Sequence, residues 1–445
     1  MHRAAARRSA IPARFLEWST VISIETLSSD RIPRPLANYN QAVRVGDLIF
    51  LAGQLASDYT TGIPEEVRIP GEYPYYGSAM EKQTRYILDN IKTLLEDIGS
   101  DMEHVVKTQV FIMDCDLFAD FDRVWKEYFP TPPPRTTVEI GPLGLLSPGA
   151  LVEIDVIAVP ADVQPEAVAG VSLPKPLAHY TPATKVGDWI FTAGQLATDF
   201  GGQGIPDDAR VDPNFPYYGS EIERQTDFIL KNYAALLEEA GSDLQHVVKA
   251  QVFLENLEDF YGFDEVWRKH FGDTPPPRTT LQVSELLIEN ALIEIDLIAV
   301  TKDGSIVPER ISTSDAPVPL ANYAQAVKAG GLVFLAGLLA SDFTNGVAPE
   351  AQVDPAFPYY GSAIEKQTDY CLNNAATILK ASGSDLGRTV KAQVFLTSLH
   401  DFYGLDKIWR RHFAPFPPRT TVELAGAGLL VPGTLVESDL IAAAF

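Results

Sequence analysis

The stretch that decides the fold is Leu36-Ala-Asn-Tyr-Asn-Gln-Ala-Val-Arg-Val-Gly46, because the chain repeats it twice. The second copy is Leu177-Ala-His-Tyr-Thr-Pro-Ala-Thr-Lys-Val-Gly187, and the third is Leu320-Ala-Asn-Tyr-Ala-Gln-Ala-Val-Lys-Ala-Gly330. Their tyrosines lie 141 and 143 residues apart. A fixed period of this length indicates tandem copies of one domain, and 445 residues are too many for one hydrophobic core. We expect a loose tail over 1–17 and domains over 18–161, 162–303 and 304–445.

Each copy shows the same order of predicted elements. In the first copy, β-rich runs at 42–45 and 48–52 flank Gly46-Asp47 and predict a hairpin. Ser78 and Glu81 have the spacing of a capping box and predict a helix start, and the pattern recurs at Ser220/Glu223 and Ser362/Glu365. That helix is expected to end near Gly99.

The rest of the copy predicts a strand over 105–112, a second amphipathic helix around Trp125, and strands that begin at Arg135 and Ala150. The resulting order, β-β-α-β-α-β-β, predicts an α+β domain. The proline-bearing stretches 160–176 and 301–319 are interpreted as linkers.

The last strand alternates in a way that predicts contact between the copies. Val152, Ile154 and Val156 point to one face, whereas Glu153 and Asp155 point to the other. The apolar face is expected to pack on helices. An acidic face needs water or a partner, and three copies supply a partner if their sheets close around a pseudo-threefold axis.

Composition narrows the classes of partner and location. A formal net charge of -24 disfavours nucleic acid. No apolar run is long enough for a membrane span, and we expect a cytoplasmic protein. The two cysteines, Cys115 and Cys371, and the scattered histidines show no metal-ligand spacing, so no metal is expected. No cofactor motif is found.

Several motifs together resemble the Rid family of reactive-intermediate deaminases, also called YjgF-like. They are Ala-Gly-Gln, Gln-Thr-x-x-x-Leu-x-Asn, Val-Val-Lys-x-x-Val-Phe, Pro-Pro-Arg-Thr-Thr-Val-Glu and Leu-Val-Glu-Ile-Asp-x-Ile-Ala-Val. The resemblance implies chorismate-mutase-like α+β domains that assemble as trimers with active sites between neighbours. The chain is then expected to be an intramolecular pseudotrimer, and further assembly of pseudotrimers is left open.

The resemblance also implies the residues of the site. An arginine that binds a substrate carboxylate corresponds to Arg135, Arg278 and Arg419, and a glutamate that handles water corresponds to Glu153, Glu294 and Glu437. Alternatively, the arginine pairs with an internal acid and the glutamate pairs across an interface. The remaining cleft residues implied by the resemblance are Tyr39, Tyr180, Tyr323, Gly53, Gly194, Gly337, Thr137, Thr280, Thr421, Asp116, Glu258 and His400.

The copies differ at some of these positions. Gln54 and Gln195 are matched by Leu338, and the acids Asp116 and Glu258 are matched by His400, so the pockets are expected to differ chemically. A Pro-Tyr-Tyr-Gly-Ser loop recurs three times. Its paired tyrosines form either an aromatic wall for a larger substrate or a contact that holds the loop against the helix.

The function that these residues favour is hydrolytic deamination of an imine, enamine or related C–N bond in a small metabolite that carries a carboxylate. The reaction needs no cofactor, because water, an arginine and a glutamate suffice. Three alternatives remain open: a specialised hydrolase of a larger cyclic or aromatic nitrogen compound, a chorismate-converting enzyme, and a non-catalytic pseudotrimer that binds small ligands.

Overall fold

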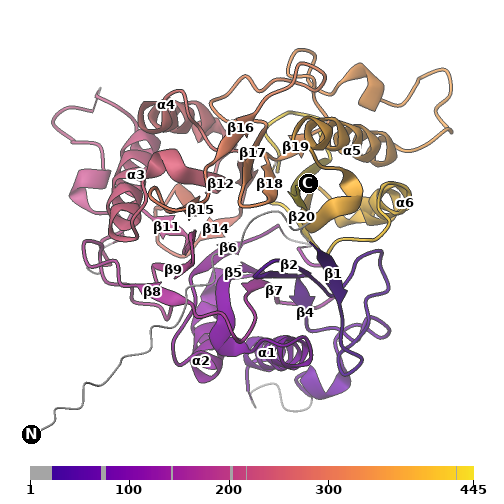
Figure 1. Cartoon of the computed structure of the whole chain (residues 1–445), viewed down its shortest axis with the longest axis horizontal. Helices are drawn as coiled ribbons and strands as arrows, with labels where there is room; N and C mark the ends of the chain where they lie inside the picture. Colours follow the sequence, from indigo (N-terminus) through magenta and orange to yellow (C-terminus); the bar gives the residue numbers. More distant parts are fainter. Residues whose placement is uncertain are drawn as a thin grey trace, which may run out of the picture.

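A computed structural model describes residues 23–71, 77–141, 144–200, 204–216, 218–426 and 428–444, so the predicted tail lies outside the described residues. Figure 1 shows three repeats around a common centre, with the helix pair of each repeat on the outside and the sheets inside. Each repeat is an α+β unit in which one sheet face is covered by helices.

The first repeat contains β1 (Ile24–Leu27), β2 (Ala42–Val45), β3 (Leu48–Leu51), β4 (Gln54–Leu55), α1 (Ala79–Asp97), β5 (Val105–Ile112), α2 (Phe118–Tyr128), β6 (Arg135–Glu139) and β7 (Val152–Ala158). Its sheet has the order β1-β2-β3-β7-β5-β6. Strands β5 and β6 are parallel and are connected through α2, while the other neighbouring strands of the sheet are antiparallel. The predicted elements are confirmed, although the last strand begins at Val152 rather than Ala150.

The other two repeats have the same topology. The second consists of β8 (Glu166–Val168), β9 (Ala183–Val186), β10 (Trp189–Thr192), β11 (Gln195–Leu196), α3 (Glu221–Glu239), β12 (Val247–Leu254), α4 (Phe260–Phe271), β13 (Arg278–Gln282), β14 (Glu285–Leu286) and β15 (Ile293–Val300). The third consists of β16 (Glu309–Ile311), β17 (Ala326–Ala329), β18 (Leu332–Leu335), β19 (Leu338–Leu339), α5 (Ala363–Ala381), β20 (Thr389–Leu396), α6 (Phe402–His412), β21 (Arg419–Glu423) and β22 (Val436–Ala443).

Both predicted linkers contain some regular secondary structure. Each contains a three-residue strand, β8 or β16, that pairs with the first hairpin strand of the repeat that follows. These strands escaped prediction because three residues are too few to show an alternating pattern.

The long helices begin where the serine caps predict. The side chains of Ser78, Ser220 and Ser362 each accept a hydrogen bond from the backbone amide three residues later. Among the three described caps, the reciprocal half of the capping box forms only between Ser220 and Glu223. In the other repeats the glutamate instead pairs with a cation on the second helix, Arg123 or Lys407.

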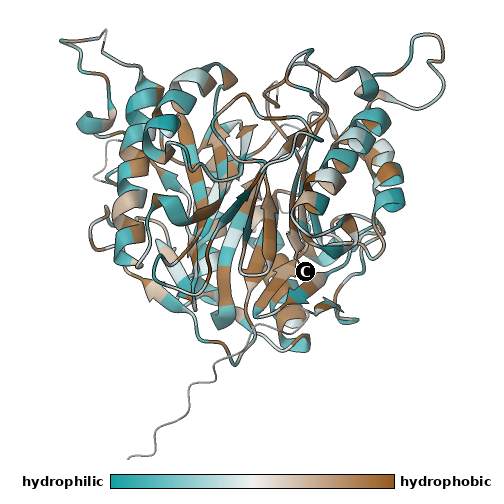
Figure 2. Ribbon diagram, turned by 45° about the horizontal axis from the view of Figure 1, so that its top comes forward, coloured by the Kyte–Doolittle hydropathy of each residue, from teal (hydrophilic) through white to brown (hydrophobic). Residues whose placement is uncertain are grey.

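The second helix of the middle repeat carries an acid, Glu265, at the position of Arg123 and Lys407. Glu223 therefore has no cation at that position to pair with, and its side chain remains hydrogen bonded to the backbone of the N-cap residue. Along the helices, hydrophilic residues gather on the outward faces, and the strands behind them are largely hydrophobic (Figure 2).

The repeats close into a ring through a shared core and through their sheet edges. One apolar cluster combines residues of all three repeats, among them Phe50, Phe191 and Phe334. β14 of the second repeat pairs with β6 of the first, and a bridge joins Leu145 of the first repeat to Val422 of the third. The backbone amide of Gln282 donates to the carbonyl of Gly428 and joins the second repeat to the third. The cyclic order of contacts is that of an intramolecular pseudotrimer.

Candidate active site

Each candidate site combines a glutamate from one repeat with an arginine from the preceding repeat. The backbone amide of Thr421 donates to the Glu153 carboxyl, which brings the end of the first repeat against β21 of the third. The amides of Thr137 and Thr280 do the same for Glu294 and Glu437.

We number each cleft by the repeat that supplies its glutamate. The first cleft holds Glu153, Tyr39 and Arg419; the second holds Glu294, Tyr180 and Arg135; the third holds Glu437, Tyr323 and Arg278. In each, the tyrosine interacts electrostatically with both the glutamate and the arginine, so it lies near both. The predicted residues are therefore brought together, across the repeat interfaces.

The glycines before the short strands make room for the glutamates. A Cβ atom on Gly53 would lie 2.0 Å from Glu153 Oε1, and one on Gly194 would lie 1.9 Å from Glu294 Oε1. On Gly337 it would lie 1.8 Å from Glu437 Oε1. No real Cβ atom comes so close, so only glycine allows the carboxyl to pack against the backbone here.

The arginines are buried and only partly paired. Arg135, Arg278 and Arg419 are 4%, 2% and 2% exposed. One amino group of each donates to an aspartate of the same repeat, at 3.0 Å to Asp122 and at 2.8 Å to Asp264 and Asp406. The other amino group, Nη1, has no hydrogen-bond partner among the described residues in any of the three.

The same aspartates help to hold the tyrosines in place. Asp264 Oδ1 accepts a hydrogen bond of 3.3 Å from the backbone amide of Asn322, the residue before Tyr323. Aromatic rings surround the guanidinium groups: the Arg278 carbon lies 4.6 Å from the ring centre of Phe263 and 5.5 Å from that of Tyr323. The internal acid that was an alternative partner for the arginine is therefore present, yet it leaves one donor group unused.

The glutamates are buried and hold a proton at neutral pH. Burial, and then the neighbouring Asp155, raises the pKa of Glu153 to about 8, against the opposing charge of Lys391. Burial and Asp439 raise the pKa of Glu437 to about 8, and burial places that of Glu294 well above its ordinary value. The Oε2 atoms of all three lack a hydrogen-bond partner within the described parts of the chain.

The tyrosines remain neutral phenols, since burial raises the pKa of Tyr39, Tyr180 and Tyr323 above the ordinary value. These tyrosines are half-buried, unlike the arginines and glutamates. Each cleft thus combines a neutral phenol, a protonated carboxyl and a cation with a free donor group. Such a set can hold an anionic group and exchange protons beside it.

Other predicted residues lie elsewhere. Asp116, Glu258 and His400 are exposed, on short 3-10 turns before the second helices, whereas the arginines and glutamates of the site are buried. Tyr75, Tyr76 and Tyr217 lie outside the described residues, whereas Tyr218, Tyr359 and Tyr360 are exposed by 72%, 97% and 79%. The described loop tyrosines therefore stay apart from the buried site.

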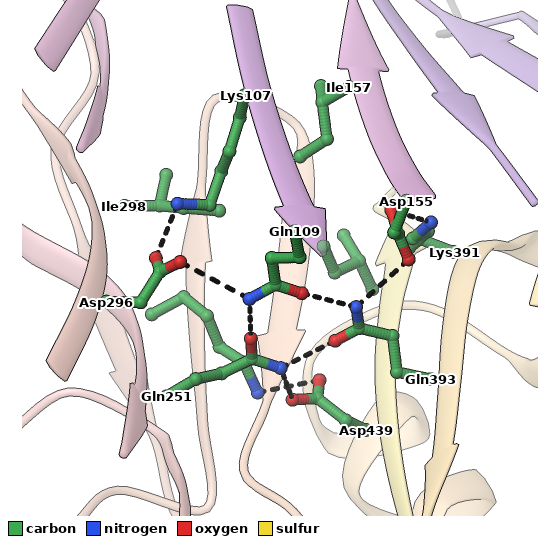
Figure 3. Close-up of a pocket in the computed structure, with 12 residues that line it drawn as sticks. Lys107, Gln109, Asp155, Ile157, Gln251, Asp296, Ile298, Lys391, Gln393 and Asp439 are labelled. Atoms are coloured by element: carbon green, nitrogen blue, oxygen red, sulfur yellow. Dashed lines mark hydrogen bonds and ion pairs between the residues drawn. The ribbon is translucent and has the colours of Figure 1, made fainter. Parts of the chain in front are cut away.

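A polar network on the central axis was missed by the sequence analysis. Gln109, Gln251 and Gln393 donate to one another in a ring, with 2.6 Å between Gln251 Nε2 and Gln393 Oε1 (Figure 3). Around it, each lysine pairs with an aspartate of the next repeat: Lys107 with Asp296, Lys249 with Asp439, and Lys391 with Asp155.

These aspartates also accept from threonines that follow the site arginines; Thr420 Oγ1 lies 2.6 Å from Asp155 Oδ2. Since Asp155 is two residues from Glu153, the network fixes the strand that carries the glutamate. The recurring Val-Lys-x-Gln spacing was a signal for it, but the spacing does not say which acid the lysine reaches.

Within the described residues, no group of three or more histidine, cysteine, aspartate or glutamate side chains is placed to hold a metal ion. The same residues include no helix that is long and apolar enough to cross a membrane.

Fold and site define a triple-repeat α+β protein with a buried arginine and glutamate at each repeat interface. The sequence model of the family described as Endoribonuclease L-PSP matches residues 29–160, 171–301 and 313–444. The chain belongs to this family, and the resemblance to Rid proteins is confirmed.

Two of the relatives each match about one repeat of this chain. A RutC family protein of Pyrococcus abyssi is 38% identical over 126 residues, which are 28% of this chain and 89% of that protein. The chloroplastic Reactive Intermediate Deaminase A of Arabidopsis thaliana is 38% identical over 126 residues, 28% of this chain and 62% of that protein. A chorismatase crystal structure covers 77% of this chain and 93% of its own at 12% identity, with a TM-score of 0.48.

Proposed function

We propose that the chain is a hydrolytic deaminase that acts on the imine or enamine of a small carboxylate-bearing metabolite, in the clefts between its repeats. One observation carries the proposal: every cleft contains a buried arginine Nη1 and a buried glutamate Oε2, and neither atom has a hydrogen-bond partner in the described structure. Buried polar atoms without partners are rare, and the same pair recurs three times, as expected of groups kept for a ligand.

The arginine supplies the carboxylate site. Its Nη1 donors are free while Nη2 is fixed by the aspartate, so an incoming carboxylate meets a guanidinium of fixed orientation. In the water-poor cleft a charge-assisted hydrogen bond contributes about 1.5–3 kcal/mol. This contact would place the atom next to the carboxylate, which is the imine carbon of a 2-imino acid, beside the glutamate.

The glutamate moves the protons. Its carboxylic acid protonates the imine nitrogen, and the carboxylate so formed takes a proton from the water that attacks the imine carbon. The acid then protonates the amino group of the carbinolamine, the C–N bond breaks, and the hydroxyl proton returns to the glutamate as the carbonyl forms. One water is consumed and one ammonia leaves, so the cycle balances without a cofactor.

The similarity to a protein named Reactive Intermediate Deaminase A supports this reaction class. The description of the family also names an endoribonuclease. With a formal net charge of -24, this chain repels a phosphate backbone, and the paired groups are too buried for a polynucleotide to reach.

The test is hydrolysis of 2-iminopropionate, generated in situ from alanine by an amino-acid oxidase. We expect the chain to accelerate ammonia release, and the triple variant Arg135→Ala, Arg278→Ala, Arg419→Ala to lose about 10- to 100-fold in kcat/KM, the cost of one charged hydrogen bond. Because each alanine removes the arginine partner of an aspartate, the triple Arg→Lys variant is measured beside it as the milder change.

Arg85→Ala is the matched control, since Arg85 is an exposed arginine that also pairs with an acid, Glu127. No acceleration by the wild-type chain would overturn the proposal and favour a hydrolase of larger cyclic substrates or a binding protein. Turnover of chorismate without ammonia release would favour the chorismate-converting alternative.

A further inference from the structure

The third cleft has a cavity that adjoins its candidate site. The cavity measures about 20 Å³, and its wall includes Tyr323 and Gly337, the tyrosine and glycine of that cleft. Tyr323 faces Arg278, and Gly337 packs against Glu437, so the space lies directly beside the groups proposed to bind and convert the substrate. A volume of this order holds about one water-sized group.

The third repeat also has smaller core residues on α5 and β22 than the other repeats. They do not line the cavity themselves, but α5 supplies Asn374 and Ile378 to its wall. Ala375 on α5 stands where α1 has Ile91 and α3 has Tyr233. Cys371 stands where the other repeats have isoleucine, and so does Ser438 on β22. All three small residues are fully buried, so the lost side-chain volume is not replaced by solvent contact.

Tyr233 shows what fills the corresponding space in the second repeat. Its hydroxyl donates to the carbonyls of Ala193, at 2.9 Å, and Ile295, at 2.6 Å. Ala193 is the counterpart of Ala336, a residue that lines the cavity of the third repeat. The phenol of Tyr233 therefore extends into the region that is open beside the third cleft.

The wall of this cavity has apolar residues at positions where other repeats have polar ones. Leu338 lines it where the other repeats have Gln54 and Gln195, and Phe343 lines it where the first repeat has Tyr59. In the first cleft the hydroxyl groups of Tyr59 and Tyr39 are hydrogen bonded. The first cleft is thus lined by polar groups at positions where the third has leucine and phenylalanine.

We propose that the third cleft prefers a substrate whose apolar side chain is one methylene longer than that of alanine, such as the imine of 2-aminobutyrate, and that Ala375 is a specificity-determining residue. The inference rests on the proposed deaminase function, which it deepens. The carboxylate meets Arg278, the C–N bond meets Glu437, and the side chain extends past Tyr323 into the cavity. A methylene group buried there raises kcat/KM about fourfold.

The experiment uses full-length chains with one working cleft. Arg135→Ala with Arg419→Ala leaves the third cleft, and Arg278→Ala with Arg419→Ala leaves the second. Each is assayed with imines generated from alanine, 2-aminobutyrate, norvaline and leucine. The third cleft is expected to show kcat/KM rising about fourfold from the alanine-derived imine to the 2-aminobutyrate-derived imine, with no further rise for norvaline and leucine because the cavity holds one such group. The second cleft is expected to show no rise.

Ala375→Ile, the residue of the first repeat, is expected to remove the preference while leaving the alanine-derived imine unaffected. It should also raise the melting temperature by filling the cavity, and Ala375→Val is the milder change. Tyr233→Ala is expected to create the preference in the second cleft.

Activity without a chain-length preference, or a preference that Ala375→Ile and Ala375→Val leave unchanged, would overturn this inference alone. No activity of either single-cleft chain on any imine, while both remain folded, would instead overturn the proposed function and the inference with it.

Discussion

Replacing all three glutamates by glutamine, Glu153→Gln, Glu294→Gln and Glu437→Gln, is expected to lower kcat/KM for 2-iminopropionate by about 10²- to 10⁴-fold. Glutamine keeps the size of the side chain but cannot give up and take back a proton. KM is expected to change little, because the arginines still bind the carboxylate. The measurement is ammonia release under the conditions used for the wild-type chain.

The same variant has a pH signature that reports the protonation state of the glutamates. Folding raises the pKa of Glu153 and Glu437 from 4.5 to about 8, so the folded state binds the extra protons. Their contribution to stability is complete below about pH 4.5 and is lost as the pH rises through about 8. The wild-type melting temperature should fall across that interval, and the fall should be smaller in the glutamine variant. Equal pH profiles would contradict protonated glutamates.

Breaking the ion pair that closes the ring should have the largest effect on stability. Lys391→Met leaves Asp155 charged and buried on the interface between the third and first repeats, and we expect a cost of about 3–5 kcal/mol. Those two repeats are not consecutive in the chain, so the pair holds together an interface without a direct covalent link. Thermal and urea unfolding, monitored by circular dichroism, measure the loss.

The double variant Lys391→Met, Asp155→Asn is expected to recover most of that loss, because it removes the unpaired charge and keeps an acceptor for Thr420. Arg85→Ala breaks an exposed pair and should cost no more than about 1 kcal/mol. If Lys391→Met costs as little as Arg85→Ala, the central network does not stabilise the ring.

Much of the fold was accessible from sequence because its signals are local. The tyrosine repeat gives the number of units, and the serine caps place the starts of the three long helices. The edge strands β8 and β16 were missed, since what defines a three-residue strand is its partner in space. The partner of Glu223 depended on Glu265 of another helix, which no local window contains.

The residues of the candidate site could be proposed from the sequence, but not which glutamate shares a cleft with which arginine. Alternation in β7 separates Glu153 from the core-facing side chains, but only the closed ring shows that it meets Arg419 and not Arg135. Likewise, the alternation does not distinguish Asp155 from Glu153. Asp155 forms an ion pair with Lys391, whereas Glu153 stays protonated and its Oε2 has no hydrogen-bond partner among the described residues. Which charge finds a partner is a property of the interface.

Covalent linkage explains how the clefts came to differ. In a homotrimer each substitution appears at every interface, whereas here Tyr59, Tyr233 and Ala375 each modify one cleft. The arginine and glutamate are nevertheless present in all three. The repeats therefore vary in the walls of the clefts around a constant arginine and glutamate.

We propose that each working cleft takes its glutamate from one repeat and its arginine from the preceding one. The most direct test of this arrangement compares two double variants in 2-iminopropionate hydrolysis: Arg135→Ala with Glu294→Gln, and Arg135→Ala with Glu153→Gln. We expect the first pair to lose only the second cleft and to be no less active than Arg135→Ala alone. The second pair should lose two clefts and show the sum of the single losses. If instead Arg135 and Glu153 behave as one unit and Arg135 and Glu294 as two, the working clefts lie within the repeats and not between them.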